Sequence, residues 1–242
     1  MVNIDTVYQK VLMIANKEQR GYITPQEFNL FADHAQKEIF EQYFYDLEQY
    51  MRLHSDAEEY SNIVHNINEK IAIFEKQQTI TVGPLGGALT SDVYRLGTVY
   101  WTDLDGNSHE IEEVEYNEFL YMNQNPISPK YKNLLAPTNK RRIYVRRGGL
   151  AGAANMILIY PTVGTVDYTY IAVPSKPNWA YVVVNGKAMY NITSTDHFDL
   201  HPAEESELVY KILKLAGVSM KRDDLKVSGQ GLETLQVQQE KQ

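Results

Sequence analysis

The sequence contains no cysteine. This absence excludes disulfides, thiolate nucleophiles and cysteine-ligated zinc or iron–sulfur sites, so packing alone must stabilise the fold. No apolar run approaches the roughly 18 to 20 residues needed to cross a bilayer. The N-terminal stretch MVNIDTVYQK also lacks the basic-then-apolar order of a signal peptide. We therefore expect a soluble chain that is not exported.

Positive charge and two of the three aromatic residue types are scarce. The chain has 23 Lys and Arg against 31 Asp and Glu, and its net charge of −8 opposes wrapping of a phosphate backbone unless the basic residues gather in one place. It has seven phenylalanines and two tryptophans, but eighteen tyrosines. Because tyrosine is enriched at protein interfaces, this excess favours an assembling protein, although tyrosine-rich sheet edges explain it equally well.

The common catalytic motifs are missing. There is no GxSxG and no HExxH, and neither GPLGGAL nor RRGGLAGAAN is followed by the Lys-Ser/Thr of a phosphate-binding loop. Glu112 and Glu113 are adjacent in a predicted strand, so their side chains would point to opposite faces and form no acid/base pair. We expect no enzyme activity, no catalytic residue and no cofactor.

Residues 1–77 are predicted to be helical. Apolar residues recur there at three- and four-residue steps, which is the spacing of one helix face. Two such stripes should pack on each other or on a sheet, so we expect a helical hairpin. The first stripe comprises Phe28, Phe31, Ala35, Ile39, Tyr43, Leu47 and Tyr50, and the second comprises Tyr60, Ile63, Ile67, Ile71 and Phe74.

The apolar period changes after Gln77. Short β-branched and aromatic runs, separated by Gly, Pro, Asn and Asp, predict an antiparallel β-sandwich or barrel-like domain over residues 78–200. Asp105-Gly106 and Asn185-Gly186 each lie between two such runs. Both pairs supply the residues that tight hairpin turns with positive φ require.

A further helix is expected over residues 201–218. Pro202 suits its first turn, glutamates complement the positive end of its dipole, and Gly217 can end it. The polar segment 219–242 has few apolar anchors, so we expect an extended tail that is disordered or ordered only against another chain. The predicted fold class is α+β: an N-terminal helical hairpin, an antiparallel β middle domain, a C-terminal helix and a tail.

The stretch from Asn16 to Glu27 has the spacing of a calcium-binding loop, with Gly21 at its sixth position. Its fifth position is Arg20, a cation where calcium needs an oxygen ligand. A capping box and a hydrophobic staple explain the same stretch without any metal. This predicted helix-capping motif comprises Ile23, Thr24, Pro25, Glu27 and Phe28.

Two other stretches are weaker candidates for metal binding. His197, Asp199 and His201 alternate along an extended segment and would share one face, but no further ligand lies nearby in the sequence. DLDGNS, from Asp103, has its glycine in the wrong place for a calcium loop and is better explained as a hairpin turn. We expect no metal at either stretch.

Positive charge does gather in one short segment. Arginine's planar guanidinium group fits carboxylates and phosphates alike, so three interpretations stay open: a solvated hairpin end, a contact with an acidic patch of another subunit, or nucleic-acid binding. A carbohydrate-binding module that uses Trp101 or Trp179 as a stacking platform is a further alternative. The candidate subunit interface comprises Lys140, Arg141, Arg142, Arg146, Arg147, Gly148 and Gly149.

Four motifs occur in the order LTSDVYRL, LIYP, YIAVP and LHP. This order resembles the head–tail connector and tail ring proteins of short-tailed bacteriophages, and the segment from Asn16 to Phe40 is similar to virion proteins of crAss-like phages. Thr90 and Ser91 depart from the pattern, in which a proline is common before the aspartate. The matching positions are Leu89, Asp92, Tyr94, Arg95, Leu96, Tyr160, Pro161, Tyr170, Ile171, Pro174, Leu200 and Pro202.

The resemblance implies a virion structural protein. Such a protein would form a closed homo-oligomeric ring of about twelve copies in the phage neck or tail, and would contact the portal and other tail proteins. Genomic DNA would pass through the ring without specific binding, because an acidic lumen repels phosphate. The resemblance places the protein in the virion, and in the host cytoplasm during assembly.

Overall fold

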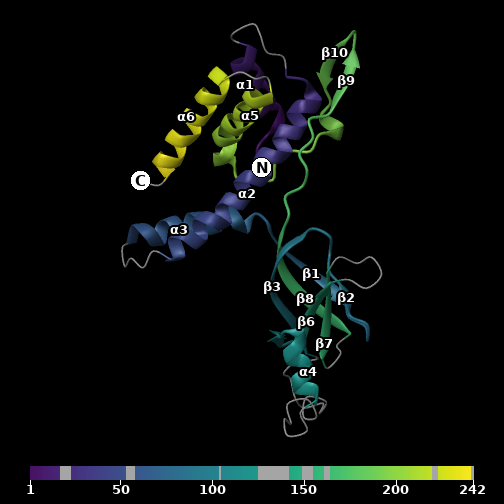
Figure 1. The fold of residues 1–242 in the computed structure, drawn as a ribbon. Coiled ribbons are helices and arrows are strands. Elements are labelled where there is room, and N and C mark those ends of the chain that lie inside the picture. The colour runs from purple at the N-terminus through teal and green to yellow at the C-terminus, as the bar shows by residue number, and fades with distance from the viewer. Residues whose placement is uncertain are drawn as a thin grey trace. The chain divides into compact units, whose positions relative to one another are not determined.

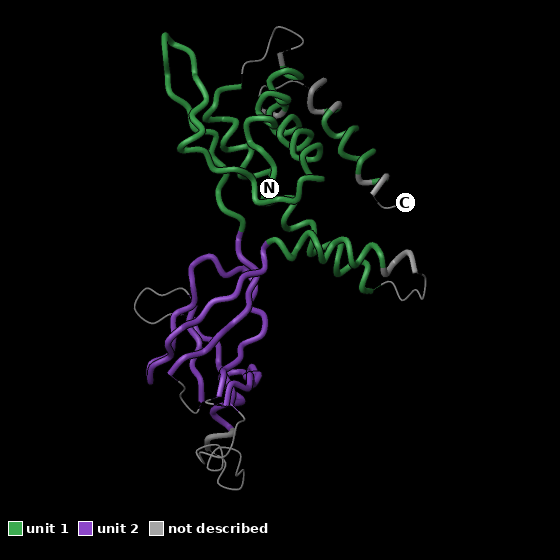
Figure 2. The backbone as a smooth tube through the Cα atoms, turned by 180° about the vertical axis from the view of Figure 1, so that it is seen from behind, with its two compact units in different colours: residues 1–73, 174–242 green, residues 74–173 purple. Residues whose placement is uncertain are grey.

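The chain folds into two compact units, seen in the computed structural model (Figures 1 and 2). One unit is helical and is built from two separate stretches, 1–73 and 174–242, while the other is a β unit formed by 74–173. Together they make the α+β class that the sequence predicts. The structure describes residues 1–16, 23–52, 58–103, 105–124, 142–148, 155–160, 164–219 and 223–240.

Helices dominate the first unit, and none of those described is long and apolar enough to cross a membrane. Two short 3₁₀ turns, η1 (Ile192–Ser194) and η2 (Pro202–Glu204), and a two-stranded hairpin of β9 (Tyr181–Val184) and β10 (Lys187–Tyr190) complete the unit. The helices are α1 (Ile4–Asn16), α2 (Pro25–Arg52), α3 (Glu58–Ala72), α5 (Glu205–Ser219) and α6 (Asp223–Glu240).

Helix α2 begins at the predicted capping box. Thr24 Oγ1 accepts a hydrogen bond from the Glu27 backbone N–H at 3.3 Å, and Glu27 Oε2 accepts one from the Thr24 N–H at 3.0 Å. Both bonds satisfy N–H groups that a helix start leaves unpaired, and the bond that the carboxylate accepts from the Thr24 N–H lowers the pKa of Glu27. Ile23 and Phe28, the predicted staple, are both buried. Gly21 lies outside the described residues.

The boundary between helix and sheet differs from the prediction at both ends of the β unit. Phe74 was expected at the end of a helix, but its carbonyl accepts the Ala172 N–H at 2.9 Å, and β1 starts at Glu75. The β unit then ends at Val173 instead of residue 200. Residues 174–200 belong to the helical unit because Trp179 packs on Tyr8, with ring centroids 4.2 Å apart.

The expected extended tail is also corrected. Residues 223–240 form α6, which packs along α5 instead of lacking structure. Gly229 permits the close approach, since a Cβ at this position would lie 3.1 Å from the Lys214 backbone nitrogen. Glu233 then pairs with Lys211 at 2.8 Å and with Lys214 at 3.0 Å. These contacts hold α6 against α5, although the segment has few apolar residues for packing.

The β unit contains two four-stranded sheets with the orders β1-β8-β3-β4 and β2-β7-β6-β5. All pairs are antiparallel except β5 with β6, which is parallel. Helix α4 (Tyr116–Gln124) follows β5. The strands are β1 (Glu75–Thr81), β2 (Gly87–Ala88), β3 (Val93–Thr102), β4 (Ser108–Glu110), β5 (Glu112–Glu113), β6 (Ile143–Gly148), β7 (Asn155–Tyr160) and β8 (Thr165–Ala172).

One apolar core is shared by both sheets, as in the predicted sandwich. Val99 and Tyr168 come from the first sheet, while Tyr144 and Ile157 come from the second, and all four belong to one buried cluster. The fully buried Tyr168 keeps a polar partner, since its hydroxyl oxygen lies 3.1 Å from Thr90 Oγ1. Burial, together with a hydrogen bond to Glu113, raises the pKa of Tyr144.

The two predicted hairpin turns are both present. Asn185 (φ +50°) and Gly186 (φ +76°) take the positive φ values of a two-residue turn between Val184 and Lys187. The turn at Asp105-Gly106 is wider, because Asp103 and Asn107 still share a backbone hydrogen bond and Gly106 has a φ of +82°. The Gly106 N–H also donates to the Asp103 carbonyl at 2.9 Å, while Leu104 lies outside the described residues.

Candidate functional site: an acid-lined pocket and an apolar hairpin

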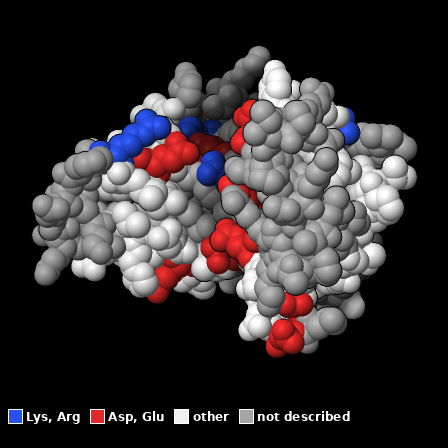
Figure 3. Space-filling view, turned by 90° about the horizontal axis from the view of Figure 1, so that it is seen from below, with Lys and Arg blue, Asp and Glu red and all other residues white. Residues whose placement is uncertain are grey.

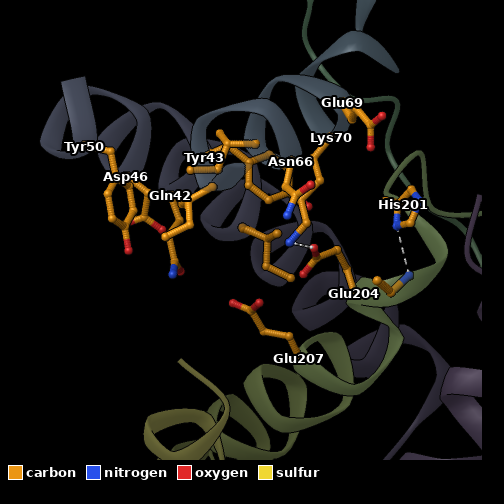
Figure 4. Close-up of a pocket in the computed structure, with 14 residues that line it drawn as sticks. Gln42, Tyr43, Asp46, Tyr50, Asn66, Glu69, Lys70, His201, Glu204 and Glu207 are labelled. Atoms are coloured by element: carbon orange, nitrogen blue, oxygen red, sulfur yellow. Dashed lines mark hydrogen bonds and ion pairs between the residues drawn. The ribbon is translucent and has the colours of Figure 1, made fainter. Parts of the chain in front are cut away.

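A pocket of about 420 Å³ lies within the helical unit, between α2, α3 and the start of α5 (Figure 4). Helical spacing brings its lining together. Ile39, Tyr43, Asp46 and Tyr50 recur at steps of four and three along α2, which places them on one face. The face of α3 contributes Ile63, Asn66, Ile67 and Lys70, and the segment from η2 into α5 contributes Ala203, Glu204 and Glu207.

Acidic side chains outnumber basic ones in the lining of this pocket, which we call the acid-lined pocket. Four carboxylates, those of Asp46, Glu69, Glu204 and Glu207, line it together with a single lysine, Lys70. In Figure 4, the side chains of Lys70 and Glu204 point toward each other across the pocket wall. Their Nζ and Oε1 atoms lie 2.6 Å apart.

Glu204 is buried although it is charged, with 1% of its surface exposed. The Lys70 ammonium group, 2.6 Å from Oε1, provides both the opposite charge and a donor, whereas Oε2 accepts no hydrogen bond from a described residue. Burial of a carboxylate is costly unless both charge and hydrogen bonds are compensated. The ion pair with Lys70 therefore compensates the buried charge of Glu204 and joins α3 to η2 at the pocket wall.

A second lysine neutralises charge behind the pocket. Lys211 of α5 is 2% exposed, and its Nζ lies 3.1 Å from Glu38 of α2, 3.5 Å from Glu207 and 2.8 Å from Glu233 of α6. Burial by itself lowers the pKa of Lys211, but its carboxylate partners outweigh burial and raise it. For the carboxylate of Glu233, burial acts in the opposite direction and raises the pKa. The two lysines that it contacts outweigh burial and bring the pKa below its ordinary value. This Lys211 cluster ties α2, α5 and α6 together.

The three residues considered for a metal accept hydrogen bonds from backbone N–H groups instead. His197 Nδ1 accepts the N–H of Ile4 at 3.4 Å, and Asp199 Oδ2 accepts the N–H of Ser175 at 2.7 Å. His201 Nδ1 accepts the N–H of Ala203 at 3.2 Å and caps η2. Within the described ranges no three acidic or histidine side chains are placed to hold a metal ion.

The basic segment is only partly described, since Lys140, Arg141 and Gly149 lie outside the described residues. The Arg142 guanidinium lies 4.1 Å from the Trp101 ring centroid, and burial lowers its pKa. The Arg147 guanidinium lies 4.3 Å from the Tyr116 ring centroid. Arg146 and Gly148 are exposed on β6. Two of the candidate interface arginines thus pack on rings of their own unit.

Neither tryptophan forms an exposed stacking platform. Trp101 is 8% exposed and Trp179 is 2% exposed. The Trp179 indole N–H donates to Asp5 Oδ1 at 2.9 Å, and its ring stacks on those of Tyr181 and Tyr190, each with a centroid distance of 5.8 Å. The geometry needed for a carbohydrate platform is therefore absent at both tryptophans.

The stacked Trp179 instead anchors the β9–β10 hairpin at its base. Figure 1 shows this two-stranded ribbon extending away from the helices of its unit. Lys187 is the only charged residue in its sequence, YVVVNGKAMY. Both its strands are edges, because the ribbon pairs with no other described strand. Its exposed apolar side chains, which define the apolar hairpin surface, are Val182, Val183, Val184 and Met189.

A second exposed apolar surface lies on α6 of the same unit. The residues of α6 that face α5 are small or charged, such as Gly229 and Glu233. Three apolar side chains of this helix are exposed instead: Val227, Leu232 and Leu235. On the molecular face seen in Figure 3, acidic and basic side chains are interspersed among uncharged ones, without a continuous basic surface among the described residues.

Sequence reasoning missed the pocket. It assigned Glu204 and Glu207 only to the dipole at a helix start, and the structure shows that both are buried. Glu207 and Lys211 lie on the same face as the apolar residues Leu208 and Ile212, and charge within an apolar stripe is the signal that could have revealed the cluster.

Two of the phage-like motif positions, Asp92 and Tyr170, meet in the β unit, whereas Pro174, Leu200 and Pro202 belong to the helical unit. The Tyr170 hydroxyl donates to Asp92 Oδ2 at 3.3 Å, and Lys76 pairs with the same carboxylate at 3.4 Å. The Val173 N–H donates to the Asp92 carbonyl at 2.8 Å, which brings the end of β8 beside the start of β3. Pro161 lies outside the described residues.

No known protein family matches the sequence, and neither does any curated protein.

Proposed function

We propose that this chain is a virion structural protein that forms a homo-oligomeric ring in the neck or tail of a short-tailed bacteriophage. The ring would connect the portal to the tail and line the DNA channel. The four motifs from LTSDVYRL to LHP support this assignment by their resemblance to connector proteins. In this role the protein acts through shape and association, without catalysis.

The apolar hairpin surface carries the proposal. An isolated two-stranded hairpin is marginally stable in water, and natural proteins usually protect open strand edges with charge. Here the base is fixed by Trp179, while Val183 remains 63% exposed. A rigidly anchored, nearly uncharged ribbon is the kind of element that a partner covers.

The partner we propose is a second copy of this chain. A ring closes through heterologous contacts, in which one patch of a subunit meets a different patch of the next. The helical unit carries two such patches, the apolar hairpin surface and the exposed apolar side chains of α6. One copy can thus offer its hairpin to the α6 surface of its neighbour.

The acidic charge supports the second part of the proposal, the DNA channel. A net charge of −8 per copy gives a ring of these subunits a strongly negative total. Such a lumen repels phosphate and lets a genome slide through without binding it.

Light scattering and negative-stain electron microscopy of the full chain, alone and with its portal, test the proposal. The wild type should form closed rings, and Val183→Lys should shift it to monomers because a charge then enters the contact. Leu85→Lys is the matched control, since Leu85 is 83% exposed but belongs to the β unit and not to the hairpin. A wild type that stays monomeric at every concentration, with and without the portal, would refute the ring.

A further inference from the structure

We propose that the outer edge of strand β9 is a site for β-strand addition, and that its occupant is β9 of a second copy of this chain. The two strands pair antiparallel about a twofold axis, so that two hairpins form one four-stranded sheet. This contact uses the backbone of the hairpin, whereas the proposed ring uses its side chains and α6. The inference therefore goes beyond the proposed function and does not depend on it.

The backbone of β9 has hydrogen-bonding groups that point away from the hairpin. In an antiparallel pair, successive residues turn their backbone groups alternately toward the partner strand and away from it. The Asn191 N–H donates to the Ala180 carbonyl at 2.9 Å, so the even-numbered residues of β9 turn inward. Val183 and its partner Ala188 therefore turn their N–H and C=O groups outward, one on each edge. No described strand pairs with either edge.

Charge distinguishes the two edges of the hairpin. Natural proteins protect an open strand edge with charged side chains, especially lysine, because an unprotected edge pairs with other strands. Strand β10 begins with Lys187, whereas β9 is the uncharged run YVVV. All three valines of β9 are exposed. The β9 edge thus combines outward backbone groups with the absence of any charged residue that would exclude a second strand.

A second copy of β9 fits this edge because the edge is complementary to itself. When Val183 lies opposite Val183 of the second copy, each donates its N–H to the carbonyl of the other, as in a hydrogen-bonded antiparallel pair. The twofold symmetry then places Val182 of each copy opposite Val184 of the other. Both strands are uncharged, so no like charges meet, and apolar β-branched side chains face each other across the new strand pair.

Pairing also stabilises a ribbon that is weak by itself. Sheets need three or more strands with an apolar face, or packing against a helix, for independent stability. Val182, Val184 and Met189 share one face of the ribbon, because Val182 pairs with Met189 and alternate residues of a strand point to the same side. In the four-stranded sheet, the two copies of this apolar face become continuous and stay available to α6 of a ring neighbour.

Sedimentation velocity of the full-length chain carrying Leu235→Lys tests the proposal. This substitution puts a charge on the exposed apolar surface of α6 and removes the ring contact, so the remaining assembly should be a dimer. Adding Val183→Pro removes the outward N–H of β9 and should weaken the dimer about tenfold or more, since two hydrogen bonds are lost. Ala188→Pro is the matched control: it removes the outward N–H directly opposite, on the other edge, and should leave the dimer affinity unchanged.

A pair of charge variants keeps the test decisive if proline disturbs the hairpin. In the same Leu235→Lys background, neither Val182→Lys alone nor Val184→Glu alone should dimerise, because each buries an unpaired charge in the new strand pair. An equal mixture of the two variants should form a heterodimer, because the new ammonium of one copy then lies opposite the new carboxylate of the other. A mixture that stays monomeric would contradict the proposed register.

The outcomes separate this inference from the proposed ring. A Leu235→Lys chain that stays monomeric at every concentration would overturn the inference, because another protein or none then covers the β9 edge. Equal dimer affinities in the Val183→Pro and Ala188→Pro variants would overturn it as well, because the β9 backbone is then not the contact. A wild type that forms no rings but does form a dimer sensitive to Val183→Pro would refute the ring and support the strand pairing.

Discussion

Replacing Lys211 with methionine should be one of the most costly single changes in the helical unit. Lys211 is 2% exposed and faces Glu38, Glu207 and Glu233. Methionine keeps the length of the side chain but removes the ammonium, and breaking a buried ion pair by removing one partner costs about 3–5 kcal/mol. The Glu207 side chain is 4% exposed and loses this compensation, whereas that of Glu38 is 38% exposed and regains water.

We therefore expect a loss at the lower end of this range, about 3 kcal/mol. With a urea dependence of about 2 kcal/mol per molar, the unfolding midpoint should fall by about 1.5 M. Each unit contains one of the two tryptophans, Trp101 in the β unit and Trp179 in the helical unit. Fluorescence of a Trp101→Phe background thus reports the helical unit alone.

Lys214→Met is the matched control. Its Nζ lies 3.0 Å from Glu233, but the lysine side chain is 28% exposed, so its removal should cost about 1 kcal/mol or less. Adding Glu207→Gln to Lys211→Met should recover part of the loss, because the stranded buried charge is then gone. Equal midpoints for Lys211→Met and Lys214→Met would refute the reasoning that burial sets the cost.

The same cluster fixes the sign of a pH dependence. The pKa of Glu233 is lowered in the folded state, so its contribution is present above its ordinary value of 4.5 and is lost as the pH falls through the folded pKa. The pKa of Lys211 is raised, so its contribution is present below 10.5 and is lost as the pH rises through the folded pKa. The stability difference between wild type and Lys211→Met should be largest between these limits and shrink beyond both.

Two more substitutions test local features of each unit by the same urea assay. Thr24→Ala removes the side-chain acceptor of the capping box and should cost the helical unit about 1 kcal/mol; an unchanged midpoint would mean that the cap does not stabilise α2. Gly97→Ala would place a Cβ 2.7 Å from Thr169 Oγ1 and 3.1 Å from the Thr169 carbonyl oxygen, and should cost the β unit about 1–3 kcal/mol. Unchanged stability there would show that β3 can move away from Thr169 of β8 at no cost.

Features with local causes could be predicted from the sequence. Thr24 and Glu27 are three residues apart, which suffices to define a capping box. Asn185-Gly186 defines its turn because few other pairs adopt two successive positive φ values. The apolar stripe from Phe28 onward likewise gave the length of α2 to within a few residues.

Features with long-range causes could not be predicted. The segment after Val173 looks like further strands, and its place in the helical unit depends on Trp179 meeting Asp5, 174 positions earlier in the chain. Helix α6 has a polar sequence with two glycines, and its order depends on Lys211 and Lys214 of another helix. Secondary-structure propensity depends on nearby residues alone, so it cannot predict either of these contacts.

The polar side chains of the helical unit divide into two kinds, and this division separates structural groups from the candidate site. Three side chains have the spacing of metal ligands: His197, Asp199 and His201. Each of them accepts a hydrogen bond from a backbone N–H that no sheet pairs. Glu204 is more deeply buried than any of them, and its Oε1 lies 2.6 Å from the Lys70 ammonium instead of a backbone N–H. A buried carboxylate needs such a compensating charge, because burial of an unpaired charge is costly. Ligand-like spacing is therefore a weak sign of function in this chain, because the side chains that show it satisfy backbone donors.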